Sequence, residues 1–163
     1  MNQEIIITKA TEKDFHSMAE IFSSIMKNGD SYIYPENFTL SQIHDFWMLD
    51  TKPYVAKIGD KIVGSYLIRQ NRIGRGSHIC NAAYMVHPDF QGKKIGRIMG
   101  EHSLIEAKKL GYKAMQFNIV VSTNERAVKL WLSLGFNIVG TIPEGFQHKE
   151  KGLVDTYIMH RFL

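Results

Sequence analysis

The chain has 163 residues, of which 44% are hydrophobic and 22% charged, and its formal net charge is +4. These values are ordinary for one globular domain that buries its own core, so we predict a single domain over residues 1–163. The positive charge suits an anionic ligand, but no lysine or arginine block is long enough to bind nucleic acid. No apolar run approaches the roughly 20 residues that cross a bilayer, so we expect no membrane partner.

Cys80 is the single cysteine, which excludes an internal disulfide. Together with the lack of a signal peptide, this predicts a cytoplasmic protein. Cys80 lies in an apolar, strand-like run, where a buried small side chain is the favoured interpretation and a nucleophile is the alternative.

The first half of the chain alternates between extended and helical patterns. Glu4–Ala10 contains consecutive isoleucines and predicts a strand. Apolar residues recur at helical spacing from Phe15 to Met26, and a second, shorter helix is predicted for Thr39–Leu49. The aromatic segment Ser31–Phe38 between these helices either covers the core or forms the wall of a binding pocket.

Three more strands are expected before the middle of the chain. Tyr54–Ile58 and Ile62–Ile68 flank the turn Gly59-Asp60 and form a hairpin. Ile79–Val86 is a third apolar run, separated from the hairpin by the polar, glycine-rich segment Asn71–Ser77.

In the second half, helix Gly96–Leu110 is followed by strand Met115–Val121, so a right-handed crossover joins two parallel strands. We expect the core-facing side chains of this helix to be Ile98, Met99, Ile105 and Leu110, with His102 packed among them rather than catalytic. Another helix starts after Asn124. The final strands, Phe136–Ile142 and Val154–Arg161, enclose a polar loop, Glu144–Gly152. This order predicts an α/β fold with a mixed, mostly antiparallel sheet of about seven strands and about four flanking helices.

The turn from Asp89 to Arg97 connects a strand to a helix. Backbone N–H groups at a helix N-terminus point outward, and the helix dipole adds partial positive charge there. Lys93, Lys94 and Arg97 add full charges. A pyrophosphate would suit this turn, although an ordinary surface connector is the alternative.

Two known phosphate-binding motifs are excluded at this turn. The P-loop requires Lys and then Ser or Thr after its second glycine, but Gly96 is followed by Arg97 and Ile98. The dinucleotide fingerprint G-x-G-x-x-G is also absent. What remains resembles the Q/R-x-x-G-x-G/A loop of the GCN5-related N-acetyltransferases. Gln91, Ile95 and Gly96 match that pattern, and Lys94 stands where the pattern has its first glycine.

A second motif extends the resemblance to nearly the whole chain, from Ile5 to Phe162. The segment from Asn124 to Trp131, followed by Gly135-Phe136, is similar to the family's N-x-x-A-x-x-L/F-Y…G-F. The resemblance implies a GNAT-like fold in which the strand ending at Val86 separates from the strand starting at Met115. It implies acetyl-CoA as cosubstrate, with no metal.

The resemblance also implies positions for the cosubstrate. Its pantetheine arm would lie along Met85 and Val86, where a backbone N–H would hold the thioester oxygen. Its pyrophosphate would lie on Gln91, Gly92, Lys93, Lys94, Ile95, Gly96 and Arg97. Asn124 would reach the cofactor arm or only cap its helix. Trp131 would be a core residue or a wall against the pantetheine.

The sequence departs from the family in its acid and base groups. An amine must lose its proton before it attacks, since its pKa is about 10. The family's usual glutamate falls near Cys80 and Asn81, and its usual tyrosine is replaced by Trp131. Our candidates for the reacting site are Asn81, Tyr84 and Asn118. The other titratable side chains, which are more naturally structural or solvated, are His78, His148 and Asp155.

The function we predict is acetyl transfer from acetyl-CoA to the amino group of a small molecule, an amino acid or an analogue. The segment Val154–Met159 is similar to the family branch that acetylates such amines. Transfer would be direct in a ternary complex, with proximity supplying most of the acceleration. The alternatives are a protein or peptide N-acetyltransferase and a non-catalytic acyl-CoA-binding module. A homodimer is the default assembly.

Overall fold

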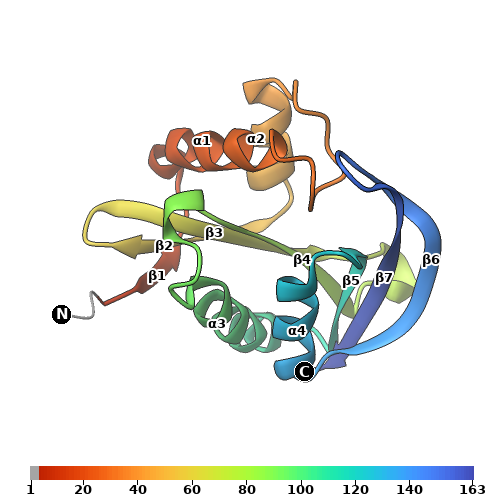
Figure 1. The fold of residues 1–163 in the computed structure, drawn as a ribbon. Helices are drawn as coiled ribbons and strands as arrows, with labels where there is room; N and C mark the ends of the chain where they lie inside the picture. The colour runs from red at the N-terminus through yellow and green to blue at the C-terminus, as the bar shows by residue number, and fades with distance from the viewer. Residues whose placement is uncertain (1–3) are drawn as a thin grey trace.

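In the computed structural model, which describes residues 4–163, a 7-stranded sheet has the order β1-β2-β3-β4-β5-β7-β6 (Figure 1). Neighbouring strands are antiparallel except β4 and β5, which are parallel. The predicted mixed sheet and its crossover are therefore confirmed. The strands are β1 (Ile6–Lys9), β2 (Lys52–Ile58), β3 (Lys61–Gln70), β4 (Ile79–Val86), β5 (Ala114–Val121), β6 (Asn137–His148) and β7 (Gly152–Phe162).

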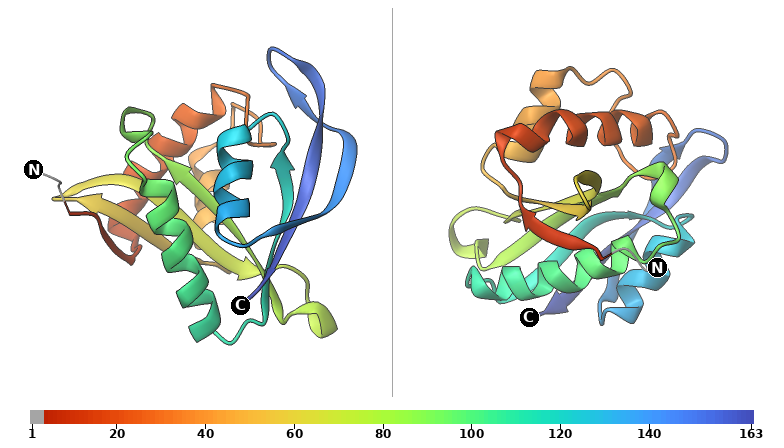
Figure 2. Two further views of the ribbon diagram at one scale, coloured as in Figure 1. Left: turned by 60° about the horizontal axis from the view of Figure 1, so that its bottom comes forward. Right: turned by 90° about the vertical axis from the view of Figure 1, so that its left-hand side faces the viewer.

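Helices cover both faces of the sheet (Figure 2). On one face lie α1 (Phe15–Met26) and α2 (Leu40–Met48), and on the other lie α3 (Ile95–Lys109) and α4 (Glu125–Ser133). The sheet separates two apolar layers. Met18, Phe22 and Trp47 belong to the α1/α2 layer, whereas Met99 and Trp131 belong to the α3/α4 layer. None of the helices within residues 4–163 combines the length and apolarity needed to pass through a lipid bilayer.

Local sequence explains where the first two helices begin and which face they bury. The stripe of α1 places Met18, Phe22 and Ile25 in the core, as its spacing predicts. A capping box starts α2: the Gln42 N–H donates to Thr39 Oγ1 at 3.2 Å, and the Thr39 N–H donates to Gln42 Oε1 at 2.9 Å. These reciprocal bonds satisfy backbone and side-chain groups that a helix start otherwise leaves unpaired.

The aromatic segment between α1 and α2 packs on the core. The ring centroids of Tyr32, Tyr34 and Phe38 lie 6.4, 6.1 and 6.1 Å from that of Phe22. The rings of this segment therefore pack against the core.

Two sequence predictions were wrong about burial and boundaries. On α3, Ile105 is 55% exposed and Leu110 is 43% exposed, although both were expected to face the core. The buried face instead follows the four-residue spacing Ile95, Met99, Ser103 and Ala107. Small side chains on this face let α3 approach the tyrosines of the sheet closely, so apolar size alone identified the wrong side of the helix.

The predicted polar loop Glu144–Gly152 is mostly strand. β6 continues to His148, and Gln147 pairs with Leu153 across the hairpin. β6 pairs with β7 along this stretch, and the register between the two strands shifts between Ile142 and Phe146. This shift breaks the alternation of apolar side chains along β6, which is why the sequence pattern ended too early.

Candidate active site

The parallel strands β4 and β5 separate soon after they begin. Their register contains only the pairs Ile79↔Ala114 and Cys80↔Met115. Beyond Cys80, β4 stays paired with β3, whereas β5 stays paired with β7 (Figure 1). The expected opening between these strands is thus present, and one edge of β4 is released from its neighbour.

Backbone hydrogen bonds show which amides face the opening. The Asn71 N–H donates to Ile79 O at 2.8 Å, and the His87 N–H donates to Val63 O at 2.9 Å, so the odd-numbered residues of β4 are bonded toward β3. Hydrogen-bonding direction alternates along a strand. The N–H groups directed toward the opening therefore belong to Ala82, Tyr84 and Val86.

Side chains from the α1/α2 side meet two of these amides. The Ala82 N–H donates to Asn81 Oδ1 at 2.8 Å. The Tyr84 N–H faces the hydroxyl of Tyr32. Burial raises the pKa of this hydroxyl, and the contact with the N–H lowers it by a smaller amount. Tyr32 therefore keeps its proton at neutral pH beside the edge of β4. In the sequence, Tyr32 is marked only as one ring of the aromatic segment Ser31–Phe38, for which a pocket wall was one of the two interpretations.

A tight turn leads from β4 to the start of α3. Gly92 has φ +79° and Lys94 has φ +63°, both in the left-handed region. The first backbone bond of the helix joins the Ile98 N–H to Lys94 O at 3.1 Å. The N–H groups of Ile95, Gly96 and Arg97 precede this bond and have no acceptor inside the helix. The arrangement fits a pyrophosphate, because these amides and the helix dipole both favour negative charge.

The geometry of Lys94 explains the departure from the family pattern. A left-handed conformation costs a residue with a Cβ atom about 1–2 kcal/mol and costs glycine nothing. Lys94 adopts the conformation for which the pattern has a glycine. The turn is therefore preserved at a steric cost, and a positive side chain is gained.

Further cations lie next to this turn. The ammonium groups of Lys61 and Lys93 lie 4.8 and 4.5 Å from the ring centroid of Phe90. Arg126 donates to Gln91 Oε1 at 3.4 Å, which connects the start of α4 to the turn. Lys61 and Arg126 are distant from the turn in sequence, so no local motif indicated them.

Arg97 points away from the turn and along the helices. It donates to Ser133 Oγ at 2.7 Å and pairs with Glu101 at 3.4 Å. Its guanidinium therefore reaches the end of α4. There it lines a cavity of about 610 Å³, together with residues that include Leu134 and Arg161.

Asn124 and Trp131 both have structural contacts. Asn124 Oδ1 accepts from the Ala127 N–H at 3.3 Å and so caps α4. Trp131 is 8% exposed, and its ring centroid lies 4.7 Å from that of Tyr84. A Cβ on Gly100 would lie 3.2 Å from the Trp131 ring, so α3 and α4 approach each other closely at this glycine. Trp131 therefore belongs to the apolar core, and its contact with the pantetheine stays a prediction.

The three candidates for the reacting site do not gather on one face of the sheet. The Tyr84 hydroxyl lies 2.7 Å from Ser103 Oγ on α3, and burial raises its pKa. Asn81 projects to the opposite face, because successive side chains alternate along a strand. Asn118 shares the face of Asn81: it donates to Asn71 Oδ1 at 2.7 Å and accepts from Gln116 at 3.0 Å. Only Asn81 and Asn118 lie on the α1/α2 side.

Cys80 and His102 are both packed residues. Cys80 is fully buried, and burial raises the pKa of its thiol to about 12. The thiol therefore stays protonated, as expected for a small core side chain. The Nδ1 atom of His102 lies 2.5 Å from the Tyr66 hydroxyl, which accounts for its place between α3 and the sheet.

His78 directly precedes β4, where its carbonyl accepts from the Lys113 N–H at 2.8 Å, whereas His148 and Asp155 stabilise the β6–β7 hairpin. His148 Nδ1 accepts from the N–H groups of Glu150 and Lys151 at 3.1 and 3.2 Å. Asp155 Oδ1 accepts from the Glu144 N–H at 2.9 Å. These bonds hold the turn and the register shift of the hairpin.

The tip of the hairpin contacts the segment that carries Tyr32 (Figure 1). The Lys149 N–H donates to Gly29 O at 3.1 Å, and the Lys149 ammonium donates to Lys27 O at 2.9 Å. The ammonium also lies 3.4 Å from the Glu36 carboxylate. The hairpin thereby holds the segment after α1 over the α1/α2 side of the opening.

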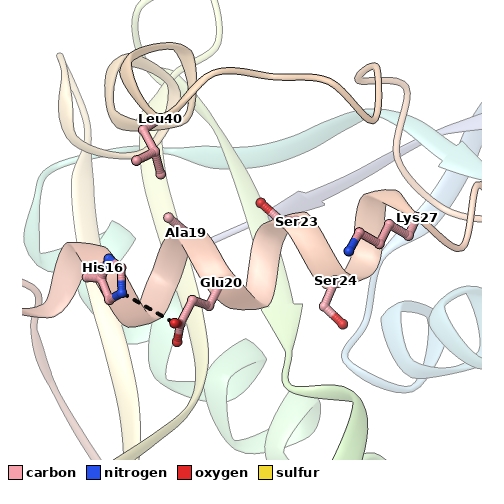
Figure 3. A pocket seen from close by; sticks show the side chains of 7 residues that line it. All are labelled: His16, Ala19, Glu20, Ser23, Ser24, Lys27 and Leu40. Carbon is pink, nitrogen blue, oxygen red and sulfur yellow. Dashed lines mark ion pairs between the residues drawn. The ribbon is translucent and has the colours of Figure 1, made fainter.

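A separate cavity of about 320 Å³ lies along the outer side of α1 (Figure 3). His16 and Glu20 form an ion pair at its edge, with 3.3 Å between Nε2 and Oε1. Its lining residues are His16, Ala19, Glu20, Ser23, Ser24, Lys27 and Leu40. None of the amides of β4 lines this cavity, so it is distinct from the opening.

Comparison with known proteins agrees with this geometry. Residues 15–136 match the model of the acetyltransferase (GNAT) family, and the chain belongs to that family. The fold is similar to that of a GCN5-related N-acetyltransferase from Kribbella flavida, with a TM-score of 0.94, 35% identity and coverage of 98% of each chain.

Two further relatives illustrate the range of similarity. The N-acetyltransferase aca1 of Schizosaccharomyces pombe is 38% identical over 98 residues, which are 60% of this chain and 47% of that protein. This chain thus matches about half of the length of aca1. The structure of yncA from Salmonella typhimurium, a putative acetyltransferase with its cofactor acetyl-CoA, has a TM-score of 0.85 and 21% identity, with coverage of 98% of this chain and 94% of that one.

Proposed function

We propose that this enzyme transfers the acetyl group of acetyl-CoA to the amino group of a small molecule, by direct attack in a ternary complex. The observation that carries the proposal is the edge of β4, where the amides of Tyr84 and Val86 face the opening beside the start of α3. An amide edge suits the amide-containing pantetheine arm, and a helix N-terminus suits a pyrophosphate.

Each part of the site has a proposed ligand. The N–H groups of Ile95, Gly96 and Arg97 would hold the pyrophosphate, with Lys93 and Lys94 adding charge. The backbone of Val86 would hold the pantetheine. Met85 is paired in register with Ser65 of β3, so its backbone is turned away from the opening. The pantetheine contact therefore depends on Val86 more than on Met85.

The protein groups around the reacting bond divide the work of proton transfer. Bound acetyl-CoA supplies the thioester whose carbonyl carbon accepts the amine. The Tyr84 N–H, which contacts the Tyr32 hydroxyl before acetyl-CoA binds, would donate to the thioester oxygen as that oxygen gains negative charge. Tyr32 holds a proton beside it and would give that proton to the leaving sulfur as the C–S bond breaks. The proton lost by the amine would return to Tyr32 through water held by Asn81 and Asn118, so protons balance.

The first test is acetyl-CoA-dependent thiol release with separate pools of amino acids, polyamines, aminoglycosides and short peptides. Release with a small-molecule pool is the expected result. Release with peptides only would contradict the small-molecule acceptor. A melting temperature raised by acetyl-CoA without release in any pool would favour a binding module, since a ligand that binds only the folded state stabilises it.

The proposal also covers the domain organisation, the location in the cell and the oligomeric state. We propose that residues 1–163 act as one acetyltransferase domain, in the cytoplasm and as a homodimer. Size-exclusion chromatography with light scattering measures the assembly directly. A monomer at micromolar concentration would contradict the dimer and leave the acetyl-transfer proposal intact.

A further inference from the structure

We propose that the acceptor carries a carboxylate or another anionic group, and that Arg69 of β3 binds this group. The inference depends on the proposed function, because it assigns the acceptor class at the same site. It starts from a charged side chain that the proposed acetyl-transfer roles leave unused.

Arg69 lies on the same face of the sheet as Asn81, which is its register partner on β4. Its guanidinium lies 4.5 Å from the ring centroid of Phe46 on α2, and its Nη2 donates to Phe46 O at 2.9 Å. The ring centroids of Tyr34 and Phe46 are 4.6 Å apart. The aromatic wall and the α2 carbonyl thus hold the guanidinium plane in one position.

Arg69 is half-buried, and the ion pairs within residues 4–163 give it no carboxylate partner. Burial lowers its pKa, opposed by Tyr34. A cation that loses hydration without gaining an anion is costly, whereas an incoming anion would recover that cost. A guanidinium has five N–H donors in a rigid fork, and one bond to Phe46 leaves enough for bidentate binding.

The register between β3 and β4 indicates how long the acceptor must be to reach from Arg69 to the reacting bond. Tyr84, whose N–H faces the reacting bond, is three residues along β4 from Asn81, the partner of Arg69. At about 3.3 Å per residue, this spacing is on the order of 10 Å. An acceptor that reaches both points has its amine and its anion several bonds apart. This favours ω-amino acids, dicarboxylic amino acids and aminoalkyl phosphonates.

Amide side chains on the same face as Arg69 suit the polar end of such a chain. Asn81, Gln116 and Asn118 all present amide groups on the α1/α2 side of the sheet. Amides donate and accept hydrogen bonds without adding charge. They would therefore orient a zwitterion without competing with Arg69 for its anionic end.

The competing interpretation is structural. Phe46 lies in the last turn of α2, and a cation there stabilises the helix by binding a terminal carbonyl. Under that interpretation, loss of Arg69 lowers stability without changing which acceptors are used. The experiment must therefore separate acceptor discrimination from stability.

The test compares wild type with Arg69→Gln, Arg69→Lys and the control Arg72→Gln. Arg72 is exposed, and within residues 4–163 its side chain donates only to Asn71 O at 3.0 Å, so its loss should leave the site unchanged. Thiol release is measured with ω-amino acids and with unbranched amines of the same length. We expect wild type to favour the acids by about 10- to 100-fold in kcat/KM, Arg69→Gln to abolish this preference, and Arg69→Lys to retain part of it.

Equal use of acids and amines by wild type would overturn the proposal, as would an unchanged preference in Arg69→Gln. A second measurement covers the case in which no acceptor releases thiol. The Arg69 Nε–H signal in ¹H–¹⁵N spectra of the CoA-bound protein should shift on titration with 4-aminobutanoate, glutamate or 3-aminopropylphosphonate. A shift without turnover would contradict the proposed function and support the anion site. Neither turnover nor a shift would refute both.

Discussion

The hydroxyl of Tyr66 lies 2.5 Å from Nδ1 of His102, which joins the centre of β3 to the middle of α3. Two neighbouring strands make equivalent contacts. The Tyr54 hydroxyl donates to Glu106 at 3.0 Å, and the Tyr84 hydroxyl lies 2.7 Å from Ser103. These stacked tyrosines thus bind α3 between His102 and Glu106 and fix the helix on the sheet. This fixed position places the start of α3 beside the opening in the sheet.

Protonation of His102 should destabilise the fold. Its pKa is lowered from 6.5, mainly by burial, while Glu106 opposes the shift and Lys109 adds to it. The unfolded chain therefore binds a proton more readily than the folded chain. By linkage, the stability from neutral His102 is complete above pH 6.5 and is lost as pH falls through its lower folded pKa. Urea denaturation at pH 7.5 and pH 5.5 should show a lower free energy of unfolding at pH 5.5.

The control for this prediction is His102→Gln, which keeps a side chain able to bond the Tyr66 hydroxyl. The variant should be less stable at pH 7.5 and should show a weaker loss between pH 7.5 and 5.5. The carboxylates with lowered pKa, Glu106 and Asp14, titrate below their usual 4.5 and 3.8 and stay ionised in this range. An unchanged pH dependence in the variant would show that another group is responsible.

Tyr32→Phe should lower activity, whereas Tyr84→Phe should lower stability. The Tyr32 hydroxyl faces the edge of β4, so its loss should lower kcat by about 10- to 100-fold with little change in melting temperature. The Tyr84 hydroxyl is bonded to Ser103 on the far face, so its loss should cost about 1 kcal/mol of stability and spare the activity of the folded enzyme. Steady-state kinetics and urea denaturation of both variants measure this. Equal kinetic losses would reject the role of Tyr32.

Substitutions at Lys94 should separate backbone strain from charge. Lys94→Gly and Lys94→Ala remove the same charge, but only glycine adopts φ +63° without a steric cost. The glycine variant should therefore be more stable than the alanine variant by about 1 kcal/mol. Both should bind acetyl-CoA more weakly than wild type and to the same degree, as measured by calorimetry. Equal stability of the two variants would mean that the turn relaxes.

Cys80 should take no part in the reaction. It is fully buried, and its pKa of about 12 leaves almost no thiolate at neutral pH. Intact mass spectrometry after incubation with acetyl-CoA should show no acetylated protein, and Cys80→Ala should retain turnover once folded. An acetyl adduct that disappears on addition of acceptor would contradict direct transfer.

The local patterns of the sequence determined most elements and the loop that marks the family. The stripe of α1, the cap at Thr39, the strand Ile79–Val86 and the turn before Ile95 are each set by residues close in sequence. Each depends on side-chain period or backbone geometry within a few residues. Such features are readable without knowledge of the fold.

Burial on α3 was decided by packing. Ile105 is large and apolar yet exposed, whereas Ser103 is small and polar yet buried against Tyr84. The close approach of α3 to the sheet requires small side chains, and hydroxyls from other strands supply the hydrogen bonds. Neither condition is visible in the helix sequence itself.

The sequence by itself determined that a strand, a glycine-bearing turn and a helix follow one another from Ile79 to Lys109, because those signals are local. Only the tertiary structure decided which side chains meet at the edge of β4. Alternation along the strand turned the Tyr84 hydroxyl away and placed Asn81 on the side of Arg69. The fold also carried Tyr32 to Tyr84 from 52 residues earlier in the chain. Contacts between distant segments depend on sheet register and helix packing, which no local pattern contains.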